Sequence, residues 1–394
     1  MALVARWRAR PPALVVSVDH GLRKEAAAEA RQVAKNAAAL GLPWRIAKVK
    51  GQAAGNLQDW ARRARYKLLV EAAEEAGFDT IVTAHHRDDQ AETFLLRLAR
   101  GSGVYGLAAM PEEGTIDGVL LARPLLSVPR SALRKIATAS RLPIAEDASN
   151  IDLRFDRVRV RAKMPELEQI GLSAARLSET ASRLRRAASA LDHYAGLLIT
   201  ENFAADSFGV VSGAATALGV APEEVALRAL ALILKAVSGA DYTPRLDAVE
   251  GLRAAILAVG EDAKLRRTLS GVVVSVGGGT LSARREWGRK GLADEAASAG
   301  ATLLWDRRFE VGVPALKGTL FVGALARSKR RLRAPEAERG AVDALPGLYR
   351  NGTLIAVPPD VRAVDEGAPL QPLSVACVVG RRLGIPVEKP VIGG

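Results

Sequence analysis

Two stretches decide the fold of this chain: LVVSVDHG at residues 14–21 and TIVTAHHRDDQAET at residues 80–93. Each begins with a short run of apolar and β-branched residues, which predicts a buried β-strand. Each run then passes directly into polar residues, Asp19-His20-Gly21 in the first stretch and His85 to Asp89 in the second. The two stretches therefore predict strands that end in turns able to carry chemistry.

Alanine-rich helical patterns separate the predicted strands. Near-continuous apolar strands joined by helices indicate a parallel sheet covered on both faces, so the expected fold class is α/β with a doubly wound sheet. Ligands of such sheets bind beyond the carboxyl ends of the strands, which is where the polar turns fall. The expected elements are strands at 14–18, 45–49 and 80–83 and helices at 25–40, 57–76 and from 88 onward.

The pattern changes beyond residue 161. Long helices are predicted there, followed by short strands with glycine-rich turns near residues 277–279 and by mixed α/β structure from about residue 300. We predict three domains: the parallel α/β sheet at residues 1–160, a helical domain at 161–290 and a small mixed α/β domain at 291–394. The long helices are expected at 172–200, 222–237 and 245–259.

Composition excludes several protein classes. No apolar run reaches the roughly 18 residues that a membrane helix needs, so we expect a soluble protein with no membrane partner. The single cysteine, Cys377, excludes an intramolecular disulfide, a Cys₄ zinc site and a cysteine-ligated iron–sulfur cluster, because each needs several thiolates. A reducing cytoplasm fits this cysteine usage best.

The charge balance favours a polyanionic partner. Lys and Arg number 56 and Asp and Glu 43, which gives a net charge of +13, and one basic run, RSKRRLR, occupies residues 327–333. Aromatic residues are only 4% of the chain, so a base-stacking platform is not expected. Recognition of a nucleic acid should therefore depend on contacts with its phosphates and on its shape. We expect RNA binding to weaken steeply as the salt concentration rises.

Three of the four histidines, His20, His85 and His86, fall at the two predicted strand ends. A lone histidine usually has a structural role, but this clustering at the cleft of a parallel sheet indicates a site. In the helix predicted from Asp88, Asp89 and Glu92 lie three residues apart on one face. Paired carboxylates can hold Mg²⁺ together with substrate phosphates, or an ammonium group. The structural alternative is that an aspartate caps the helix.

Two further patterns concern phosphate recognition. Arg157, Arg159 and Arg161 alternate, so an extended segment would point all three guanidinium groups to one side, towards a phosphate backbone or a triphosphate. Residues 101–106 match G-x-G-x-x-G, but they follow a helix rather than a strand, which excludes the dinucleotide-binding interpretation. A helix C-cap followed by a turn, or a flexible loop that closes over the cleft, explains these glycines better.

Taken in order, these motifs resemble the tRNA(Ile)-lysidine synthetases across about the first 165 residues. The matching segments are Val18 to Arg23, Asn56-Leu57 with Arg62, Arg65 and Tyr66, Thr83 to Thr93, Arg100 to Gly103, Arg123 to Leu126, and Asp147 to Arg161. The resemblance implies an N-type ATP-pyrophosphatase fold. It also implies adenylation of the wobble cytidine at C2 and displacement of AMP by lysine, forming lysidine. The implied partners are ATP, Mg²⁺, free L-lysine and tRNA(Ile) with a CAU anticodon. Assembly into a homodimer is possible.

The resemblance also implies roles for individual residues. Asp19, His20, Arg65 and His85 would bind ATP, and Asp89 would hold Mg²⁺. The catalytic group would be His85, Asp89 and Glu92, with Glu92 and Asp89 on the lysine ammonium groups. Arg157 and Arg161 would neutralise phosphate charge.

The sequence departs from the family in two places. The phosphate loop, Ser-Gly-Gly-x-Asp-Ser, does not occur in these residues, and we expect that the sequence as given starts just after it. Val158 stands where the family usually has Asn. Two alternatives therefore stay open: a catalytically inactive tRNA-binding homologue, and a metal-dependent phosphoesterase using Asp19, His20, His85 and Asp89.

Overall fold

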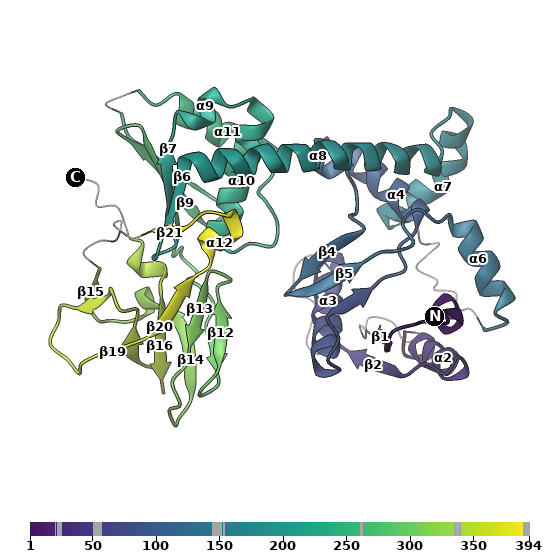
Figure 1. Ribbon diagram of the computed structural model, residues 1–394, viewed down its shortest axis with the longest axis horizontal. Helices are drawn as coiled ribbons and strands as arrows, with labels where there is room; N and C mark the ends of the chain where they lie inside the picture. Colours follow the sequence, from purple (N-terminus) through teal and green to yellow (C-terminus); the bar gives the residue numbers. More distant parts are fainter. Residues whose placement is uncertain are drawn as a thin grey trace. The chain divides into compact units, whose positions relative to one another are not determined.

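A computed structural model describes residues 1–19, 21, 26–49, 57–143, 152, 154–260, 263–334, 337 and 340–388. The chain divides into two compact units, residues 1–188 and 189–394 (Figure 1). The boundary falls within one helix, α8 (Ala174–Asn202). The division into three domains at residues 160 and 290 stays a prediction.

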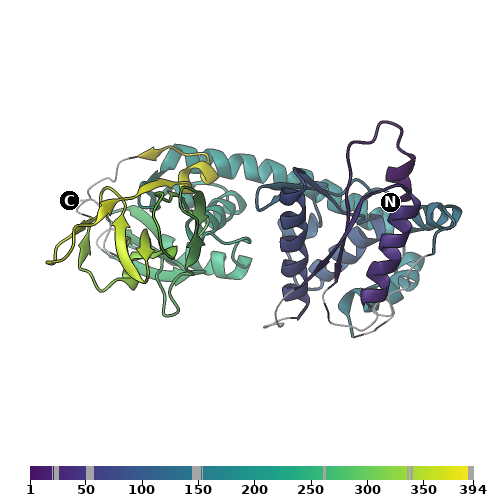
Figure 2. The ribbon, with the colours of Figure 1, turned by 90° about the horizontal axis from the view of Figure 1, so that it is seen from below.

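The first unit alternates strands and helices, as the sequence predicts. Helices α2 and α3 lie on opposite sides of the strands (Figure 2). The elements before α8 are α1 (Ala2–Arg6), β1 (Val15–Asp19), α2 (Ala26–Ala39), β2 (Trp44–Lys48), α3 (Leu57–Glu75), β3 (Thr80–Val82), α4 (Arg87–Leu98), α5 (Val104–Leu107), β4 (Glu113–Ile116), β5 (Val119–Ala122), α6 (Arg130–Ala139) and α7 (Asp156–Gln169).

The strands of this unit form two parallel pairs. β1 pairs with β2, β3 pairs with β5, and β4 adds an antiparallel edge to β5. In the described part of the chain, β1 and β3 do not hydrogen-bond to each other. A cavity of about 110 Å³ lies between them. The residues that line it are Leu14, Val16, Leu69, Ala72, Ala73, Phe78, Thr80, Ile81 and Val82.

The glycine-rich residues after α4 form a helix-to-helix turn, which agrees with the sequence-based interpretation. Gly101 has a φ of +68°, a backbone conformation that costs glycine little. Gly103 is the N-cap of α5. These glycines therefore end one helix and begin another rather than opening a strand-to-helix phosphate site.

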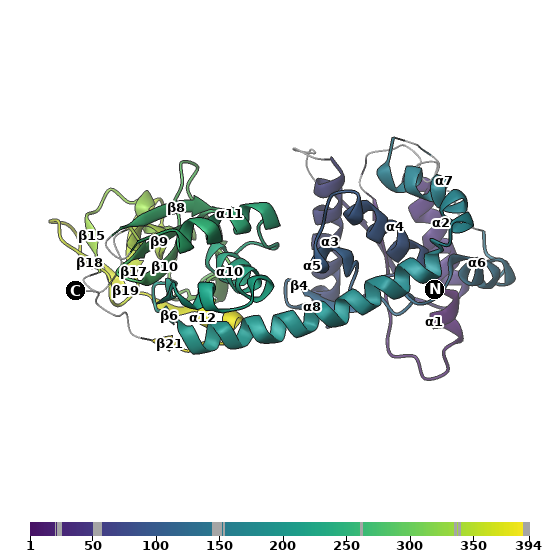
Figure 3. The same cartoon turned by 90° about the horizontal axis from the view of Figure 1, so that it is seen from above.

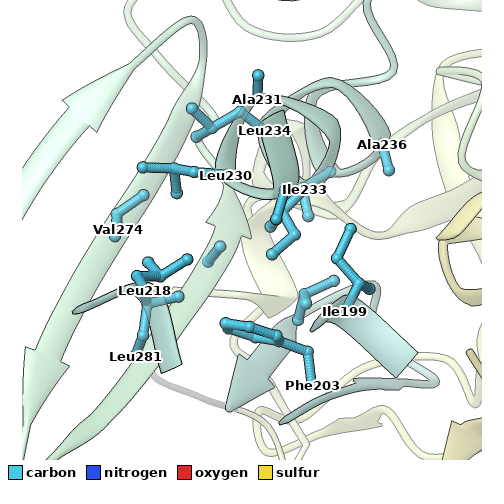
Figure 4. Packing of buried hydrophobic residues seen from close by; sticks show 14 of the residues in the cluster. Ile199, Phe203, Leu218, Leu230, Ala231, Ile233, Leu234, Ala236, Val274 and Leu281 are labelled. Atoms are coloured by element: carbon cyan, nitrogen blue, oxygen red, sulfur yellow. The ribbon is translucent and has the colours of Figure 1, made fainter. Parts of the chain in front are cut away.

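The second unit contains two hydrophobic cores. In the first, α10 (Glu223–Ser238) packs against a six-stranded sheet of order β21-β6-β7-β10-β9-β8, and Figure 4 shows its buried side chains meeting Phe203 and Leu281. Its elements are β6 (Phe203–Asp206), β7 (Val211–Ala214), α9 (Ala217–Val220), α11 (Leu246–Leu257), β8 (Leu265–Leu269), β9 (Val272–Gly277), β10 (Thr280–Arg285), α12 (Val379–Leu383) and β21 (Val387–Glu388).

The other core lies among short strands and includes the fully buried Trp305 and Phe309. Its five-stranded sheet has the order β11-β14-β16-β17-β19, beside a sheet of order β12-β13-β20 and the β15-β18 pair. The strands are β11 (Glu295–Ala297), β12 (Thr302–Trp305), β13 (Phe309–Gly312), β14 (Leu320–Ala324), β15 (Leu332–Arg333), β16 (Pro346–Arg350), β17 (Thr353–Val357), β18 (Arg362–Ala363), β19 (Gln371–Pro372) and β20 (Ser374–Cys377). No helix in the described residues is both long enough and apolar enough to span a membrane.

Packing in the first of these cores should be sensitive to cavity formation. Ile233 in α10 is 0% exposed, so Ile233→Ala should lower the unfolding free energy of the second unit by about 2–5 kcal/mol. Val220→Ala removes apolar atoms from a side chain that is 88% exposed and should change it by less than about 0.5 kcal/mol. Urea-dependent hydrogen exchange in peptides from α10 measures both changes. Equal effects of the two substitutions would contradict the packing described.

Candidate active site at the start of helix α4

Residues 83–86 connect β3 to α4 and carry two of the predicted histidines. His86 is the N-cap of α4. Its backbone N–H donates to Oδ2 of Asp89 at 2.9 Å, and the Asp89 N–H donates to Nδ1 of His86 at 3.4 Å. This capping box satisfies N–H groups that the first helical turn leaves without partners. The predicted helix start near Asp88 is confirmed, and Asp89 does cap the helix.

The two aspartates at this helix start are held differently. Asp88 accepts the backbone N–H of Arg130 at 2.8 Å through Oδ2, which ties α4 to the start of α6. Asp89 uses Oδ2 for the cap, and its Oδ1 accepts no hydrogen bond from the residues that the structure describes. Asp89 therefore has an oxygen available for a cation as well as a structural role.

His85 is the histidine that faces charged groups from several elements. Its Nδ1 lies 2.9 Å from the hydroxyl oxygen of Thr83. Burial lowers the pKa of His85 to about 4; Asp89 raises it, and Arg123, Arg157 and Arg62 lower it further. The ring is therefore neutral near pH 7, and Nε2 is the nitrogen that remains for a substrate.

Glu92 forms the buried ion pair of the site. It is only 2% exposed, and Arg161 donates to both of its oxygens, from Nε at 2.7 Å and from Nη2 at 3.2 Å. The pair raises the pKa of Arg161. In the structure, Arg161 thus takes the position on Glu92 that the sequence prediction assigns to a lysine ammonium group.

The arginines after residue 156 lie on a helix, so the extended conformation that would point all three guanidinium groups to one side does not occur. They belong to α7, which runs beside α4 (Figure 3). Helical periodicity puts Arg157 and Arg161 on one face, where Arg157 donates to the hydroxyl of Thr93 at 3.3 Å. Arg159 instead pairs with Asp156. The three guanidinium groups therefore do not share one side.

Two arginines near His85 received no role from the sequence. Arg123 follows β5 directly and is 6% exposed; its Nη1 donates to the Pro111 carbonyl at 2.9 Å, while Nε has no partner among the described residues. Arg62 stacks over the Tyr66 ring, 5.0 Å from its centroid. The sequence feature that could have identified Arg123 is its position: it is a charged residue directly after β5, a strand that pairs with β3.

The remaining predicted site residues are Asp19, Arg65 and His20. Asp19 is buried at the end of β1 and accepts the Gly21 N–H at 2.9 Å. Within the described ranges it has no hydrogen bond or ion pair to the His85 group. His20 lies outside the described residues. Arg65 is exposed on α3.

The donor set at α4 fits a magnesium ion that is held mainly by substrate and water. Mg²⁺ usually takes one or two protein carboxylates and completes its octahedron with phosphate oxygens and water. Asp89 offers one such oxygen. No group of three or more His, Cys, Asp or Glu side chains that could hold a metal occurs among the described residues.

The ion pair of Glu92 should control the stability of the first unit. Arg161→Met leaves a buried carboxylate without its counter-charge, so the unfolding free energy should fall by about 3–5 kcal/mol. Arg183→Met breaks the exposed pair with Glu179 on α8 and should cost less than about 1 kcal/mol. Urea-dependent hydrogen exchange in α4 peptides compares them, and similar losses would contradict the buried-pair assignment.

The ring of His85 should stay neutral between pH 8 and about pH 5. Because its folded pKa lies below the unfolded value, the unfolded chain takes up a proton first as the pH falls from about 6.5 to about 4, and stability decreases over that range. The ¹⁵N chemical shifts of His85, assigned with a His85→Gln variant, report the protonation. A midpoint near pH 6.5 would show that the surroundings do not act on the ring.

Comparisons with known proteins identify the family of this chain. Residues 1–167 match the model of the PP-loop domain family. The tRNA(Ile)-lysidine synthase of Ruegeria pomeroyi is 38% identical over 91% of this chain and 84% of that protein. Those of Rhodopseudomonas palustris and Bradyrhizobium diazoefficiens are 44% and 41% identical, over 71% and 74% of this chain and 85% and 88% of theirs. This chain therefore belongs to the tRNA(Ile)-lysidine synthase family.

Proposed function

We propose that this chain is a ligase that joins lysine to C2 of the wobble cytidine of tRNA(Ile) with a CAU anticodon, at the expense of ATP. The observation that carries the proposal is its similarity to tRNA(Ile)-lysidine synthases over 84–88% of the length of the three relatives compared. The PP-loop domain implies the use of ATP. Lysine, Mg²⁺, cytoplasmic location and assembly into a homodimer are parts of the proposal.

The reaction needs activation because a ring carbonyl oxygen is a very poor leaving group. In the first step, O2 of the cytidine attacks the α-phosphorus of ATP and pyrophosphate leaves. In the second step, an amino group of lysine attacks C2, the C2–O2 bond breaks and AMP leaves with the oxygen. The attacking ammonium must first lose a proton, which a carboxylate or an imidazole in a dry cleft can accept.

The residues at α4 suit both steps. Arg157, Arg123 and Arg62 give the surroundings of His85 a positive field, which suits the triphosphate and the charge on leaving pyrophosphate. A neutral His85 has Nε2 available for a hydrogen bond to substrate. Asp89 and Glu92 attract the lysine ammonium, and Glu92 must share its lone pairs between that ammonium and Arg161.

Asp89 is also the residue that would hold Mg²⁺, through the oxygen that the helix cap does not use. When bound, the ion supplies neutralisation of phosphate charge. Asp19, His20 and Arg65 complete the proposed ATP-binding group. These assignments rest on the family's motifs, and the contacts of Asp89 are compatible with them.

The test is lysidine formation by the purified chain. With ATP, Mg²⁺ and radiolabelled lysine, label should enter a CAU-anticodon tRNA(Ile) transcript and not one with another anticodon. Asp89→Asn should lower the rate about 100-fold or more, because a charge that stabilises the reacting groups is lost. Asp88→Asn is the matched control on the same turn and should stay within a few-fold of the unmodified chain.

Several outcomes would reject the proposal for this chain. Retention of tRNA affinity without ATP binding would favour the inactive tRNA-binding homologue. Metal-dependent cleavage of phosphodiesters, abolished by His85→Ala, would favour the phosphoesterase. If Asp89→Asn and Asp88→Asn lower the rate of lysidine formation equally, Asp89 has no specific role in the reaction.

A further inference from the structure

The segment at residues 106–112 connects α5 to β4 and anchors Arg123. The backbone N–H of Arg123 donates to the Glu112 carbonyl at 2.7 Å, and its Nη1 donates to the Pro111 carbonyl at 2.9 Å. Among the described residues, the Pro111 carbonyl is the one hydrogen-bond acceptor of this guanidinium group. We call residues 106–112 the carbonyl loop, because several of its carbonyl oxygens accept hydrogen bonds from side chains. The position of Arg123 therefore depends on the position of this loop.

Helix α4 holds the carbonyl loop through two side chains. Gln90 is buried; its Nε2 donates to the Met110 carbonyl and its Oε1 accepts the Met110 N–H, both at 2.8 Å. Nη1 of Arg97 donates to the carbonyls of Gly106 and Ala109, at 2.8 and 3.1 Å. The helix that carries the carboxylates of the site is thus connected to the loop that anchors an arginine of the site.

Helix α8 adds a third side chain, Arg185, from a distant part of the sequence. Its Nη2 donates to the carbonyls of Ala108 and Met110, the second at 2.5 Å. In the part of the chain that the structure describes, Arg185 forms no ion pair with a carboxylate. Backbone carbonyls of the loop are therefore the partners of this guanidinium group.

The charge of Arg185 adds little to the stability of the fold. Burial lowers its pKa; Glu112 raises it, and Arg97 and Arg123 lower it. A half-buried arginine close to two others has an unfavourable environment for its charge. What Arg185 contributes is therefore its pair of hydrogen bonds to the carbonyl loop, and that loop anchors Arg123.

The conformation of the carbonyl loop needs such support. Ala109 has a φ of +52°, a left-handed backbone conformation that residues with a side chain adopt rarely. It is 5% exposed and packs in one apolar cluster with Phe94 of α4 and Ala181 of α8. Strained conformations persist only where surrounding contacts fix them. Because Arg185 bonds the carbonyls of the residues directly before and after Ala109, its removal would allow the loop to relax there.

We propose that Arg185 is a positioning residue for lysidine formation: through the carbonyl loop it holds Arg123 beside His85. The proposal rests on the proposed function, in which Arg123 offsets the charge of the triphosphate and of leaving pyrophosphate. Among the described residues Arg185 donates only to backbone carbonyls, so it acts through Arg123 and not on a substrate. Misplacing a catalytic group by about 1 Å can lower a rate about 100-fold.

The first test is a double-mutant cycle on the rate of lysidine formation. Arg123→Met should lower the rate about 100-fold or more, because a charge that stabilises the leaving group is lost. Arg185→Met should lower it about 10–100-fold. Because Arg185 acts through Arg123, the variant with both substitutions should stay within about 3-fold of Arg123→Met alone. If the two effects multiply instead, the proposal is overturned.

The matched control is Arg186→Met. Arg186 is the next residue of α8 and is exposed, so its substitution changes the net charge equally and should keep the rate within about 2-fold. Equal losses in Arg185→Met and Arg186→Met would overturn the proposal. Arg185→Lys keeps the charge and one donor group, and its loss should be smaller than that of Arg185→Met. It carries the same cycle if Arg185→Met does not fold.

The second test uses the protonation of His85, measured by its ¹⁵N chemical shifts without any substrate. Arg123 is one of the cations that lower the pKa of His85 to about 4. The midpoint should therefore rise in Arg123→Met and in Arg185→Met, and should rise no further when both substitutions are combined. A role of Arg185 in stability alone would leave the midpoint of the folded protein at about 4.

The positioning role and the proposed function can fail separately. If the unmodified chain forms no lysidine but the midpoint of His85 follows the expected pattern, the proposed function fails and the positioning role stands. If the chain forms lysidine and Arg185→Met changes neither the rate nor the midpoint, the positioning role is wrong and the proposed function stands.

Discussion

The candidate site depends on the buried ion pair between Glu92 and Arg161. A carboxylate that is 2% exposed is costly unless an opposite charge and hydrogen bonds compensate it, and Arg161 supplies both through two nitrogens. The pair connects α4 to α7 in one register, because a guanidinium group can donate two hydrogen bonds to a carboxylate in only a few orientations. Arg157 lies one turn before Arg161 and is thereby held at Thr93. Apolar packing of Phe94 with α8 supports the same helix pair.

The second constraint is the concentration of positive charge around His85. Three arginines lower its pKa, whereas the carboxylate of Asp89 raises it. Because the ring is neutral, it adds no charge to the group of side chains around it. Under the proposed function, the cations would suit the phosphates of ATP and the carboxylates the ammonium of lysine, so the two co-substrates would be attracted to different residues of one group. A charged imidazole would weaken this separation.

The strand ends and the start of α4 could be predicted because their signals are local. An apolar β-branched run followed by polar residues needs no distant partner to be recognised. Helix α7 could not be predicted in the same way: its arginines alternate as in a strand, and Pro165 disfavours a helix interior. Its register is stabilised by the contact of Arg161 with Glu92, and these two residues are 69 positions apart in the sequence. The burial of Arg123 and the separation of β1 from β3 are likewise consequences of tertiary packing.

The same reasoning limits what a net charge of +13 can mean. An arginine that is already paired with a carboxylate attracts a second anion only weakly, and Arg330, which is paired with Asp365, is an example. Only cations without such partners can bind a further anion strongly, so the composition of the chain says less than the pairing of its charges. Arg333 and Arg362 differ from the surrounding ion pairs in this respect, because the β15-β18 strand pair brings them directly opposite each other. Like charges opposed in this way lower the stability of a strand pair unless an anion lies between them.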